Sequence, residues 1–439
     1  MNEIGNDEVV SALQTIIDQF GDHIEPHAIS LINNLSTAFS SYCTAAGGDD
    51  DDDDALMAAM QCLECIGTVL KGICGRPDIY RNIEPQLLPI VNQILGNDGE
   101  YIEFLENALD ILTFLTFFQD DLSPELWGAF PLIYIAFDKW AFDYLYLMVP
   151  SIENYIGKST QTFLTGAAVL PIGEVKYIDL IFSMVKKTLT EKRSTESEMR
   201  KALSLYMCIL HNCKGQVDNY LSALNDEILG MLNPLNKEAQ TPLTRIVIFQ
   251  ILGSALHYNP KLQLDELERR GVTEYVFNQW ITDSASMESW LSKKITVLGF
   301  SSIFLLPSSS FPAAISSGLP QIVSTMTSIM EKMQNELAIP ETDGFNDIDE
   351  ERNQLEDGDI RGFGEDEDVT NLIDSAYMDA FKSATEDDFS PFLLGDDWGD
   401  ENDDDDDYMS PIDEIDTLVF YTDSLRSAFE REPMVSRSV

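Results

Sequence analysis

The chain has 439 residues, of which 44% are hydrophobic and 23% are charged, proportions typical of a globular protein. Its 76 acidic residues outnumber 27 Lys and Arg, so the formal net charge is −49. Such a field repels nucleic acids and anionic lipid and attracts basic proteins, so we expect no direct nucleic-acid binding.

The amino-terminal residues and the apolar stretches indicate where the protein resides. MNEIGNDEVV has neither the basic nor the apolar part of a secretory signal. The densest apolar stretches, 111–118 and 130–137, are far shorter than the roughly 20 residues that cross a bilayer. Six Cys in such a chain are expected to be free thiols in a reducing compartment. We therefore predict a soluble intracellular protein without membrane insertion.

Apolar residues recur every three or four positions up to about residue 335, the period of amphipathic helices. Between residues 100 and 118, for example, Glu100, Glu103, Glu106 and Asp110 share one helical face. Taken in chain order, the predicted antiparallel helix pairs are 7–20 with 26–43, 55–74 with 81–95, 100–118 with 124–139, 174–189 with 198–213, and 216–232 with 242–257.

Proline marks many of the predicted helix starts, because the first helical residue needs no N–H donor. Ser123–Pro124 and Thr241–Pro242 add a hydroxyl cap just before the proline. The predicted helix-starting prolines are Pro26, Pro85, Pro124, Pro242, Pro260 and Pro411.

Short helices with a broad apolar face cannot bury that face alone, and stacked helix pairs solve this problem. The pairs often start about 40–48 residues apart, the period of HEAT-type repeats. We therefore predict an all-α fold, a HEAT-repeat superhelical solenoid of antiparallel helix pairs with a long acidic disordered insert.

Two acidic stretches interrupt the helical pattern. Residues 47–54 contain six consecutive Asp, and residues 337–410 are rich in Asp, Glu, Gly and Asn. Between Glu341 and Asp416, 30 acidic residues face three basic ones, a formal charge of −27. The predicted organisation is a solenoid over 1–336 with an acidic loop at 47–54, a largely disordered insert at 337–410, a terminal helix at 411–432 and a disordered tail at 433–439.

Catalytic and metal-binding patterns are weak. None of the four His residues lies in a nucleophile or metal motif, and no phosphate-binding glycine pattern occurs. Cys62 and Cys65, and Cys208 and Cys213, invite a zinc interpretation, but they continue apolar helical stripes and favour buried core thiols. We predict no enzyme, no cofactor and no metal.

Other conspicuous residues have structural interpretations. His257 and Tyr258 are expected to pack at a helix boundary. The aromatic residues on helices are expected in the core first and on a binding surface second; they are Trp127, Trp140, Tyr144, Trp280 and Trp290. The basic pairs are expected to be solvated; they are Lys186–Lys187, Arg269–Arg270 and Lys293–Lys294. Ser390–Pro391 and Ser410–Pro411 favour turn and cap chemistry, with phosphorylation as the alternative.

The acidic stretches are the candidate binding site. Phe389, Phe392, Leu393 and Trp398 punctuate the acids of the insert, which a pure spacer does not need. Acids with apolar anchors suit a mobile arm that holds a basic surface. A solvated linker, or folding of the insert onto the solenoid, are the alternatives. The candidate residues for basic-cargo binding are Asp49, Asp50, Asp51, Asp52, Asp53, Asp54, Asp396, Asp397, Trp398, Asp403, Asp404, Asp405, Asp406 and Asp407.

Several motifs together resemble the importin-7/importin-8 branch of the importin-β family, over its C-terminal half. In residues 107–156, the resemblance rests on Ser123, Pro124 and Trp127, then Phe142, Asp143 and Tyr144, then Met148, Val149 and Pro150. LHYNPKLQLDELE (256–268), NQWITDSASMESWLSKKITVLGF (278–300) and SPIDEIDTLVFY (410–421) continue it in the same order.

The resemblance implies a nuclear transport receptor that wraps cargo, such as ribosomal proteins or histones, and releases it to Ran-GTP. It further implies binding to Phe-Gly nucleoporins, possible pairing with another importin, and shuttling between cytoplasm and nucleus. Such receptors are about twice as long, so the Ran-binding N-terminal repeats are expected to be absent from this sequence. A HEAT-repeat scaffold subunit and an acidic histone chaperone are the alternative functions.

Overall fold

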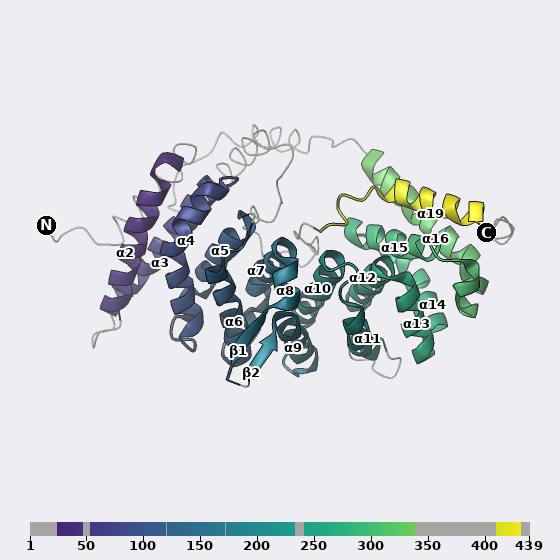
Figure 1. Cartoon of the computed structure of the whole chain (residues 1–439), viewed down its shortest axis with the longest axis horizontal. Helices are drawn as coiled ribbons and strands as arrows, with labels where there is room; N and C mark the ends of the chain where they lie inside the picture. Colours follow the sequence, from purple (N-terminus) through teal and green to yellow (C-terminus); the bar gives the residue numbers. More distant parts are fainter. Residues whose placement is uncertain are drawn as a thin grey trace, which may run out of the picture. The chain divides into compact units, whose positions relative to one another are not determined.

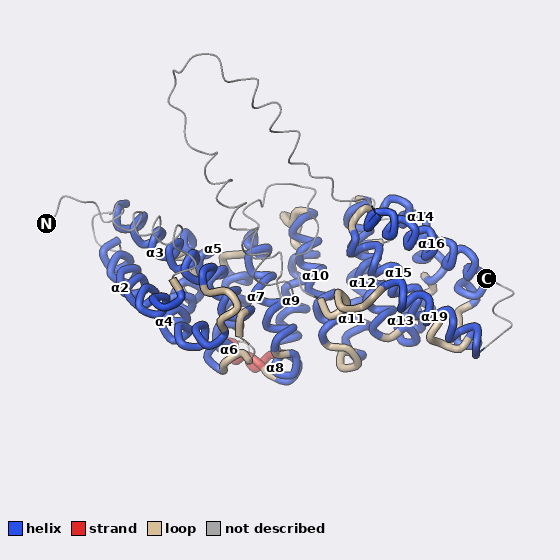
Figure 2. The backbone as a smooth tube through the Cα atoms, turned by 90° about the horizontal axis from the view of Figure 1, so that it is seen from above, coloured by secondary structure: helices blue, strands red, loops and turns tan. Residues whose placement is uncertain are grey.

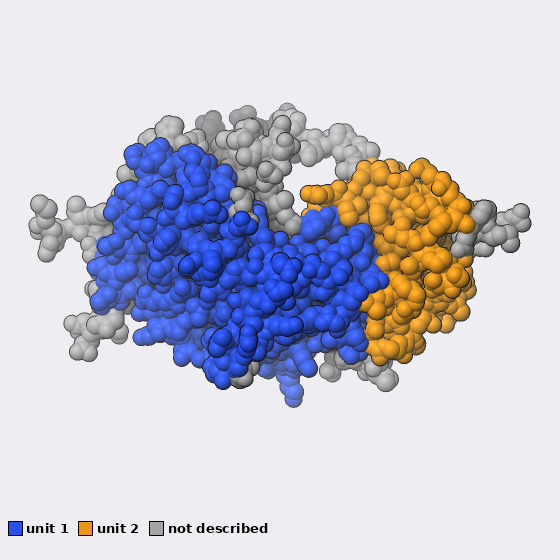
Figure 3. Space-filling view, viewed as in Figure 1, with its two compact units in different colours: residues 1–259, 410–412 blue, residues 260–409, 413–439 orange. Residues whose placement is uncertain are grey.

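The computed structural model describes residues 24–46, 53–119, 121–171, 173–232, 241–338 and 410–431. These residues form 16 α-helices, short 3-10 turns and one small β-hairpin. The chain divides into two compact units (Figure 3): unit 1 comprises residues 1–259 and 410–412, and unit 2 comprises residues 260–409 and 413–439.

The helices of unit 1 form two layers (Figure 1). The first layer contains α2 (Ala28–Ala46), α4 (Pro77–Gly96), α6 (Pro124–Lys139), α9 (Tyr177–Thr190) and α11 (Asp218–Met231). The second contains α3 (Asp53–Gly72), α5 (Leu105–Phe117), α7 (Leu145–Lys158), α10 (Glu196–Asn212) and α12 (Pro242–Tyr258). Neighbouring helices of a layer contact each other. First-layer helices begin 41–53 residues apart, close to the roughly 40–47 residues of HEAT-type repeats, so the all-α repeat prediction is confirmed.

The helix pairs of unit 1 match the prediction only in part: α9 packs on α10, as predicted for 174–189 with 198–213, but the earlier pairs differ. α2 packs on α3, and α4 packs on α5, so the predicted pairing of 55–74 with 81–95 is wrong. Residues 7–20 lie outside the described residues. The predicted pairs before α7 are therefore shifted by one helix. α7, which contacts α6, was not predicted, and counting it restores the agreement at α9 and α10. Pro150 lies inside α7. Because the prediction used proline as a sign of a helix start, it did not recognise a helix with proline in its interior.

Hydroxyl caps fix several helix starts as predicted. Ser123 Oγ accepts the Leu126 N–H at 3.0 Å in front of Pro124. Thr241 caps α12 in the same way, through the Thr244 N–H at 3.3 Å. Each cap satisfies one of the first-turn N–H groups that have no helical acceptor.

Three of the six predicted proline starts are wrong. Pro26 lies in the 3-10 turn η2 (Glu25–His27), and Pro411 lies in a turn. Pro85 lies inside α4, which already begins at Pro77. An internal proline costs about 3 kcal/mol in an isolated helix. Ten of the twenty α4 residues are buried, and this packing offsets the cost.

A cluster of aromatic rings joins α6, α7 and α9 at the centre of unit 1. Trp127 stacks on Tyr177 with ring centroids 4.8 Å apart, and Phe130 meets Tyr155 edge-on at 5.1 Å. The Tyr155 hydroxyl donates to the Leu126 carbonyl at 2.6 Å. Such ring pairs contribute roughly 0.5–1.5 kcal/mol each beyond their buried area. The core interpretation of Trp127 is confirmed.

Between α7 and α9 the chain forms α8 (Thr160–Thr165) and an antiparallel hairpin of β1 (Ala167–Leu170) and β2 (Gly173–Lys176). Ala167 pairs with Lys176, and Leu170 pairs with Gly173. The helix predicted from residue 174 therefore begins only at Tyr177, because its first residues are held in the hairpin. Gly166 lies so close to Tyr177 that an added Cβ would approach the ring to 2.6 Å, so a side chain there is excluded.

Unit 2 is built around α15 (Trp290–Ile303), in which twelve of fourteen residues are buried. The helices packed around it are α13 (Pro260–Arg270), α16 (Ala313–Ala338) and α19 (Thr417–Arg431), and α14 (Thr273–Asp283) packs on α13 and α16 (Figure 2). The buried indole of Trp280 donates to Thr296 Oγ1 at 3.2 Å. Trp290, the first residue of α15, is in contrast 38% exposed.

Among the described residues, one helical stretch, Asp54–Gly72 of α3, is long and apolar enough to cross a membrane by length and composition. Half of that stretch is buried within the protein. Its contacts with α2 and α5 account for its apolar composition.

Candidate partner-binding site

Most residues predicted to bind cargo, eleven Asp and one Trp, lie outside the described residues. These are Asp49, Asp50, Asp51, Asp52, Asp396, Asp397, Trp398, Asp403, Asp404, Asp405, Asp406 and Asp407. Asp53 begins α3, and Asp54 is exposed next to it. Their role in binding stays a prediction.

The second layer of unit 1 carries an exposed acidic surface within the described residues. Glu103, Glu106 and Asp110 are exposed along α5 and the 3-10 turn before it, η3 (Ile102–Phe104). Tyr146 of the adjacent helix α7 is 38% exposed. Partial burial raises the pKa of Tyr146, with smaller contributions from Glu106 and Tyr144. Carboxylates beside an accessible aromatic ring form a surface suited to Lys and Arg side chains.

Ser410 attaches the chain to unit 1 where the described structure resumes after residue 338. Its Oγ lies 2.7 Å from Nδ1 of His211 on α10 and accepts the Ile412 N–H at 3.4 Å. Nε2 of His211 lies 2.8 Å from Oγ of Ser254 on α12. Ser410, Ile412 and Ser254 are buried. The carboxyl end of the acidic insert is therefore held against α10 and α12.

His211 is neutral in this arrangement. Burial lowers its pKa to about 3, with smaller contributions from His257 and Lys214. Burial also lowers the pKa of His257 to about 4, and Lys214 Nζ lies 3.3 Å from its Nε2. A neutral imidazole donates through one nitrogen and accepts through the other, and hydroxyl groups on both sides satisfy it.

The turn interpretation of Ser410–Pro411 is confirmed, and the predicted helix start at Pro411 is wrong. Residues 411–415 form turns, and α19 begins at Thr417. Asp416 caps this helix, because its Oδ1 accepts the Val419 N–H at 2.9 Å.

α19 packs on α15 through small side chains. Its buried residues are Thr417, Ser424 and Ala428, which lie seven and four positions apart and therefore share one face. Tyr421 is partly buried and packs against a cluster formed by Val297 of α15 and Ile329, Met330 and Met333 of α16. Two other large apolar residues of α19 stay accessible. Leu418 is 41% exposed and Val419 is 53% exposed.

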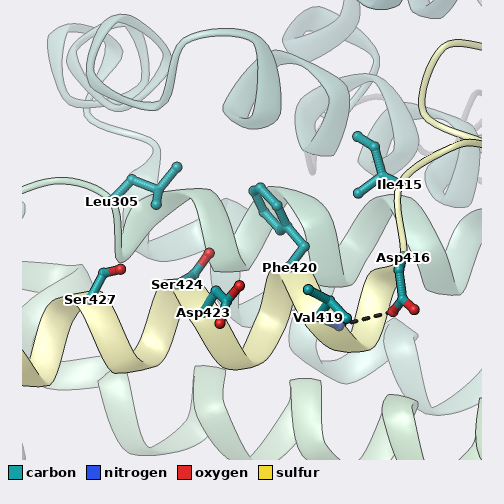
Figure 4. Close-up of a pocket in the computed structure, with 8 residues that line it drawn as sticks. All are labelled: Leu305, Ile415, Asp416, Val419, Phe420, Asp423, Ser424 and Ser427. Carbon is teal, nitrogen blue, oxygen red and sulfur yellow. Dashed lines mark hydrogen bonds between the residues drawn. The ribbon is translucent and has the colours of Figure 1, made fainter.

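A groove lies between α19 and the turn that follows α15 (Figure 4). Its volume is about 280 Å³. Figure 4 shows Leu305, Phe420 and Ile415 as a row of apolar side chains, with Asp423 and Asp416 on either side of Val419. We call this the α19 groove; its lining residues are Leu305, Ile415, Asp416, Val419, Phe420, Asp423, Ser424 and Ser427.

Arg431, at the end of α19, binds the segment that carries Leu305, which forms the wall of the α19 groove opposite α19. Its guanidinium donates to the Leu305 carbonyl at 2.7 Å and to the Phe304 carbonyl at 2.5 Å. A cation at the carboxyl end of α15 also meets the negative end of the helix dipole. Leu305 itself remains 46% exposed, so its side chain is available to a partner.

Lys293 and Lys294 are buried, which corrects the prediction that they are solvated. Lys293 Nζ lies 2.5 Å from Glu336 Oε1 of α16, and Lys294 Nζ donates to the Asp413 carbonyl at 2.9 Å. Burial lowers the pKa of Lys294, opposed by the charges of Asp413 and Asp416. α16 and the chain leading into α19 cover α15, and neither contact is local in sequence.

The thiols are core residues, as predicted. Cys62, Cys65, Cys208 and Cys213 are buried. Burial raises the pKa of Cys62 to about 11 and that of Cys213 to about 12. No group of three or more His, Cys, Asp or Glu side chains in the described ranges could hold a metal ion.

The boundary interpretation of Tyr258 is also confirmed. Its hydroxyl donates to Asp218 Oδ1 at 2.6 Å and accepts the Val217 N–H at 2.9 Å. The end of α12 is thereby joined to the start of α11.

Sequence reasoning missed the α19 groove. One signal of it exists: four consecutive large apolar residues, Leu418 to Tyr421, run around the helix instead of forming a single stripe. One packing face cannot cover such a run, so part of it must stay accessible.

The chain matches a family model described as "Importin-11-like, TPR repeats" over residues 79–379. It is 26% identical to "Probable importin-7 homolog" of Dictyostelium discoideum, over 99% of this chain and 43% of that protein. It is 29% identical to "Importin beta-like SAD2 homolog" of Arabidopsis thaliana, over 77% of this chain and 32% of that protein. Human "Importin-8" is 26% identical over 74% of this chain and 30% of its own length.

The chain thus spans less than half the length of these curated relatives. A solved structure, described as that of Lph2, a bidirectional nuclear transport receptor in S. cerevisiae, superposes with a TM-score of 0.58. It covers 98% of this chain and 41% of that one at 14% identity, a likeness that shows the fold alone. Because the family match covers more than half of the sequence, the chain belongs to the importin family of helical-repeat proteins.

Proposed function

We propose that this chain is the C-terminal, cargo-binding portion of an importin-type nuclear transport receptor that carries basic proteins, such as ribosomal proteins or histones, into the nucleus. Membership of the importin family is the observation that carries the proposal. The net charge of −49 supports basic cargo, because a strongly negative surface attracts positive partners and repels nucleic acids.

The proposed mechanism is non-covalent. Cargo meets the acidic stretches at 49–54 and 341–416, the second of which carries a formal charge of −27. The acidic surface of α5, with Tyr146 beside it, adds fixed contacts. The attachment of Ser410 to His211 keeps the carboxyl end of the insert close to unit 1. Because exposed charges are screened within about 8 Å at physiological salt, cargo affinity should fall steeply as salt rises.

The proposal includes the further partners of a transport receptor. Phe-Gly nucleoporins would carry the receptor through the pore between cytoplasm and nucleus. Ran-GTP would act on repeats outside these 439 residues, and a second importin could join the receptor. The comparisons support these partners at the level of the family.

The test measures binding of a basic ribosomal protein at several salt concentrations. Changing Asp403 through Asp407 to Asn should weaken binding at low salt by about tenfold or more, roughly 1.4 kcal/mol, and should flatten the salt dependence. A matched control removes the same charge from five exposed glutamates elsewhere; these are Glu125, Glu174, Glu191, Glu268 and Glu274, each changed to Gln. Equal affinity and salt slope in the Asp variant and the wild type would remove the acidic insert from the mechanism.

Two further assays separate the proposal from its alternatives. A static scaffold should pass through a column of immobilised Phe-Gly repeats, whereas a transport receptor should be retained. An acidic histone chaperone binds basic proteins equally well, so import into permeabilised cells by the full-length receptor distinguishes it from a carrier.

A further inference from the structure

We propose that the α19 groove binds a short peptide segment in which one large apolar residue is flanked by Lys or Arg side chains. The inference deepens the proposed function, because the partner is again a basic protein. It adds a site within unit 2 that recognises an apolar anchor, whereas the acidic stretches recognise charge.

The apolar part of the α19 groove is accessible without rearrangement. Leu305 is 46% exposed and Val419 is 53% exposed. Phe420 lies between Leu305 and Ile415 in the row of Figure 4. The volume of about 280 Å³ is below the roughly 300–1,000 Å³ of small-molecule sites. It suits one side chain of a peptide better than a cofactor or a metabolite.

The rim of the α19 groove is negatively charged. Asp416 and Asp423 lie on either side of Val419. Asp416 accepts the Val419 N–H, and Asp423 pairs with Arg426 at 2.9 Å while 57% of its side chain stays exposed. An exposed pair of this kind is weak and can be exchanged for a partner's cation. Two carboxylates around an apolar floor therefore favour flanking Lys or Arg.

Arg426 pairs with Asp423 of the rim, and two other cations donate to backbone carbonyls. Arg431 donates to the carbonyls of Phe304 and Leu305, and Lys294 donates to that of Asp413. Asp413 and Glu414, which directly precede the groove residue Ile415 in the sequence, are exposed and add negative charge to that segment. A second copy of this chain would bring the same carboxylates face to face, so a basic peptide is the better occupant.

Both walls are fixed before a partner arrives. Asp416 caps the start of α19, and Arg431 ties its end to the chain segment that carries Leu305. The entropic cost of ordering the α19 groove when a peptide binds is therefore small, and preorganised sites bind short ligands more tightly for this reason.

The test uses the full 439-residue chain and three fluorescent peptides. The probe is Ser-Lys-Lys-Phe-Lys-Lys-Ser, the second peptide has Ala in place of Phe, and the third has Ser in place of every Lys. The wild-type protein should bind the Phe-containing probe at least about fivefold more tightly than the Ala peptide. This affinity ratio of the Phe peptide to the Ala peptide should fall to about one in Val419→Asn. It should persist in Leu418→Asn, the control, because Leu418 is similarly exposed on the same helix but lies outside the groove. An unchanged ratio in Val419→Asn overturns the inference.

A second variant tests the charged rim without disturbing α19. Asp416→Asn keeps the helix cap, because Asn caps as well as Asp, and removes one charge. Affinity for the probe should fall two- to threefold, with a shallower salt dependence. If the Lys-free peptide binds as tightly as the probe, the α19 groove recognises only the apolar residue. The proposed contribution of flanking Lys or Arg side chains is then refuted. A concentration-dependent dimer that disappears in Val419→Asn would identify a second copy as the occupant instead.

The two proposals fail in different ways. If Val419→Asn changes nothing but the Asp403–Asp407 variant loses cargo, the α19 groove is refuted and the proposed function stands. If only Val419→Asn changes binding, the acidic insert is refuted and the α19 groove stands.

Discussion

Acidification from pH 7 to pH 5 is expected to destabilise unit 1 through two buried histidines. His211 has a pKa of about 3 and His257 a pKa of about 4, mainly because burial disfavours their charged forms. The ring nitrogens of His211 contact the hydroxyl groups of Ser410 and Ser254, and Lys214 lies beside His257. Protonation of either imidazole would therefore place an additional positive charge in a buried environment, which is unfavourable.

The sign and the magnitude follow from linkage between protonation and unfolding. Below about pH 6.5, the usual pKa of His, the unfolded chain binds protons that the folded chain does not, so stability falls as pH falls. The loss continues down to the folded-state pKa. At pH 5 each histidine is about 1.5 pH units below its unfolded pKa, and each unit corresponds to about 1.36 kcal/mol. The expected loss relative to pH 7 is about 2 kcal/mol for each histidine.

Urea unfolding at pH 7, 6 and 5 measures this loss. The free energy of unfolding of the wild type should fall by about 2 kcal/mol more between pH 7 and pH 5 than that of His211→Gln. Carboxylate titration affects both proteins alike and cancels in the comparison. His27→Gln, a control at an exposed histidine of η2, should behave like the wild type. Equal pH dependence in the wild type and His211→Gln would refute the assignment of a buried neutral imidazole.

The remaining predictions concern packing and reactivity. Ser410→Ala leaves a nitrogen of buried His211 without its hydroxyl partner, so we expect a loss of about 1–3 kcal/mol and faster amide exchange at 410–416; exchange equal to the wild type would contradict this. Leu112→Ala, at a fully buried site in α5, should cost about 2–5 kcal/mol in thermal unfolding, whereas Leu418→Ala should cost far less. The six cysteines, all within the described residues, form no disulfide. Burial raises the pKa of Cys43, Cys62, Cys74 and Cys213 to about 11–12. The thiols should therefore react slowly with iodoacetamide at pH 7.5 and rapidly in urea, and fast native reaction would refute their burial.

The local order of the chain could be predicted from the sequence because its causes are local. The helix caps at Ser123 and Thr241 involve partners three residues away. The period of apolar residues up to about residue 335 indicated an array of helices, and the burial of Cys62 and Trp127 followed from their positions on apolar helices. The order of short motifs along the chain also predicted the importin family, which the family match confirms.

Only the tertiary structure decided which faces are covered and which residues meet. Ser410 and His211 are 199 positions apart, and no periodicity links them. Lys293 is buried, and its partner Glu336 lies on α16. The α19 groove forms where α19 meets the turn after α15, because the fully buried residues of α19 are small and Val419 stays exposed. Helix formation depends on neighbours three or four residues away, so a pattern in the sequence predicts it. Burial depends on which distant segments cover each helix face, so only the packing of the folded chain determines it.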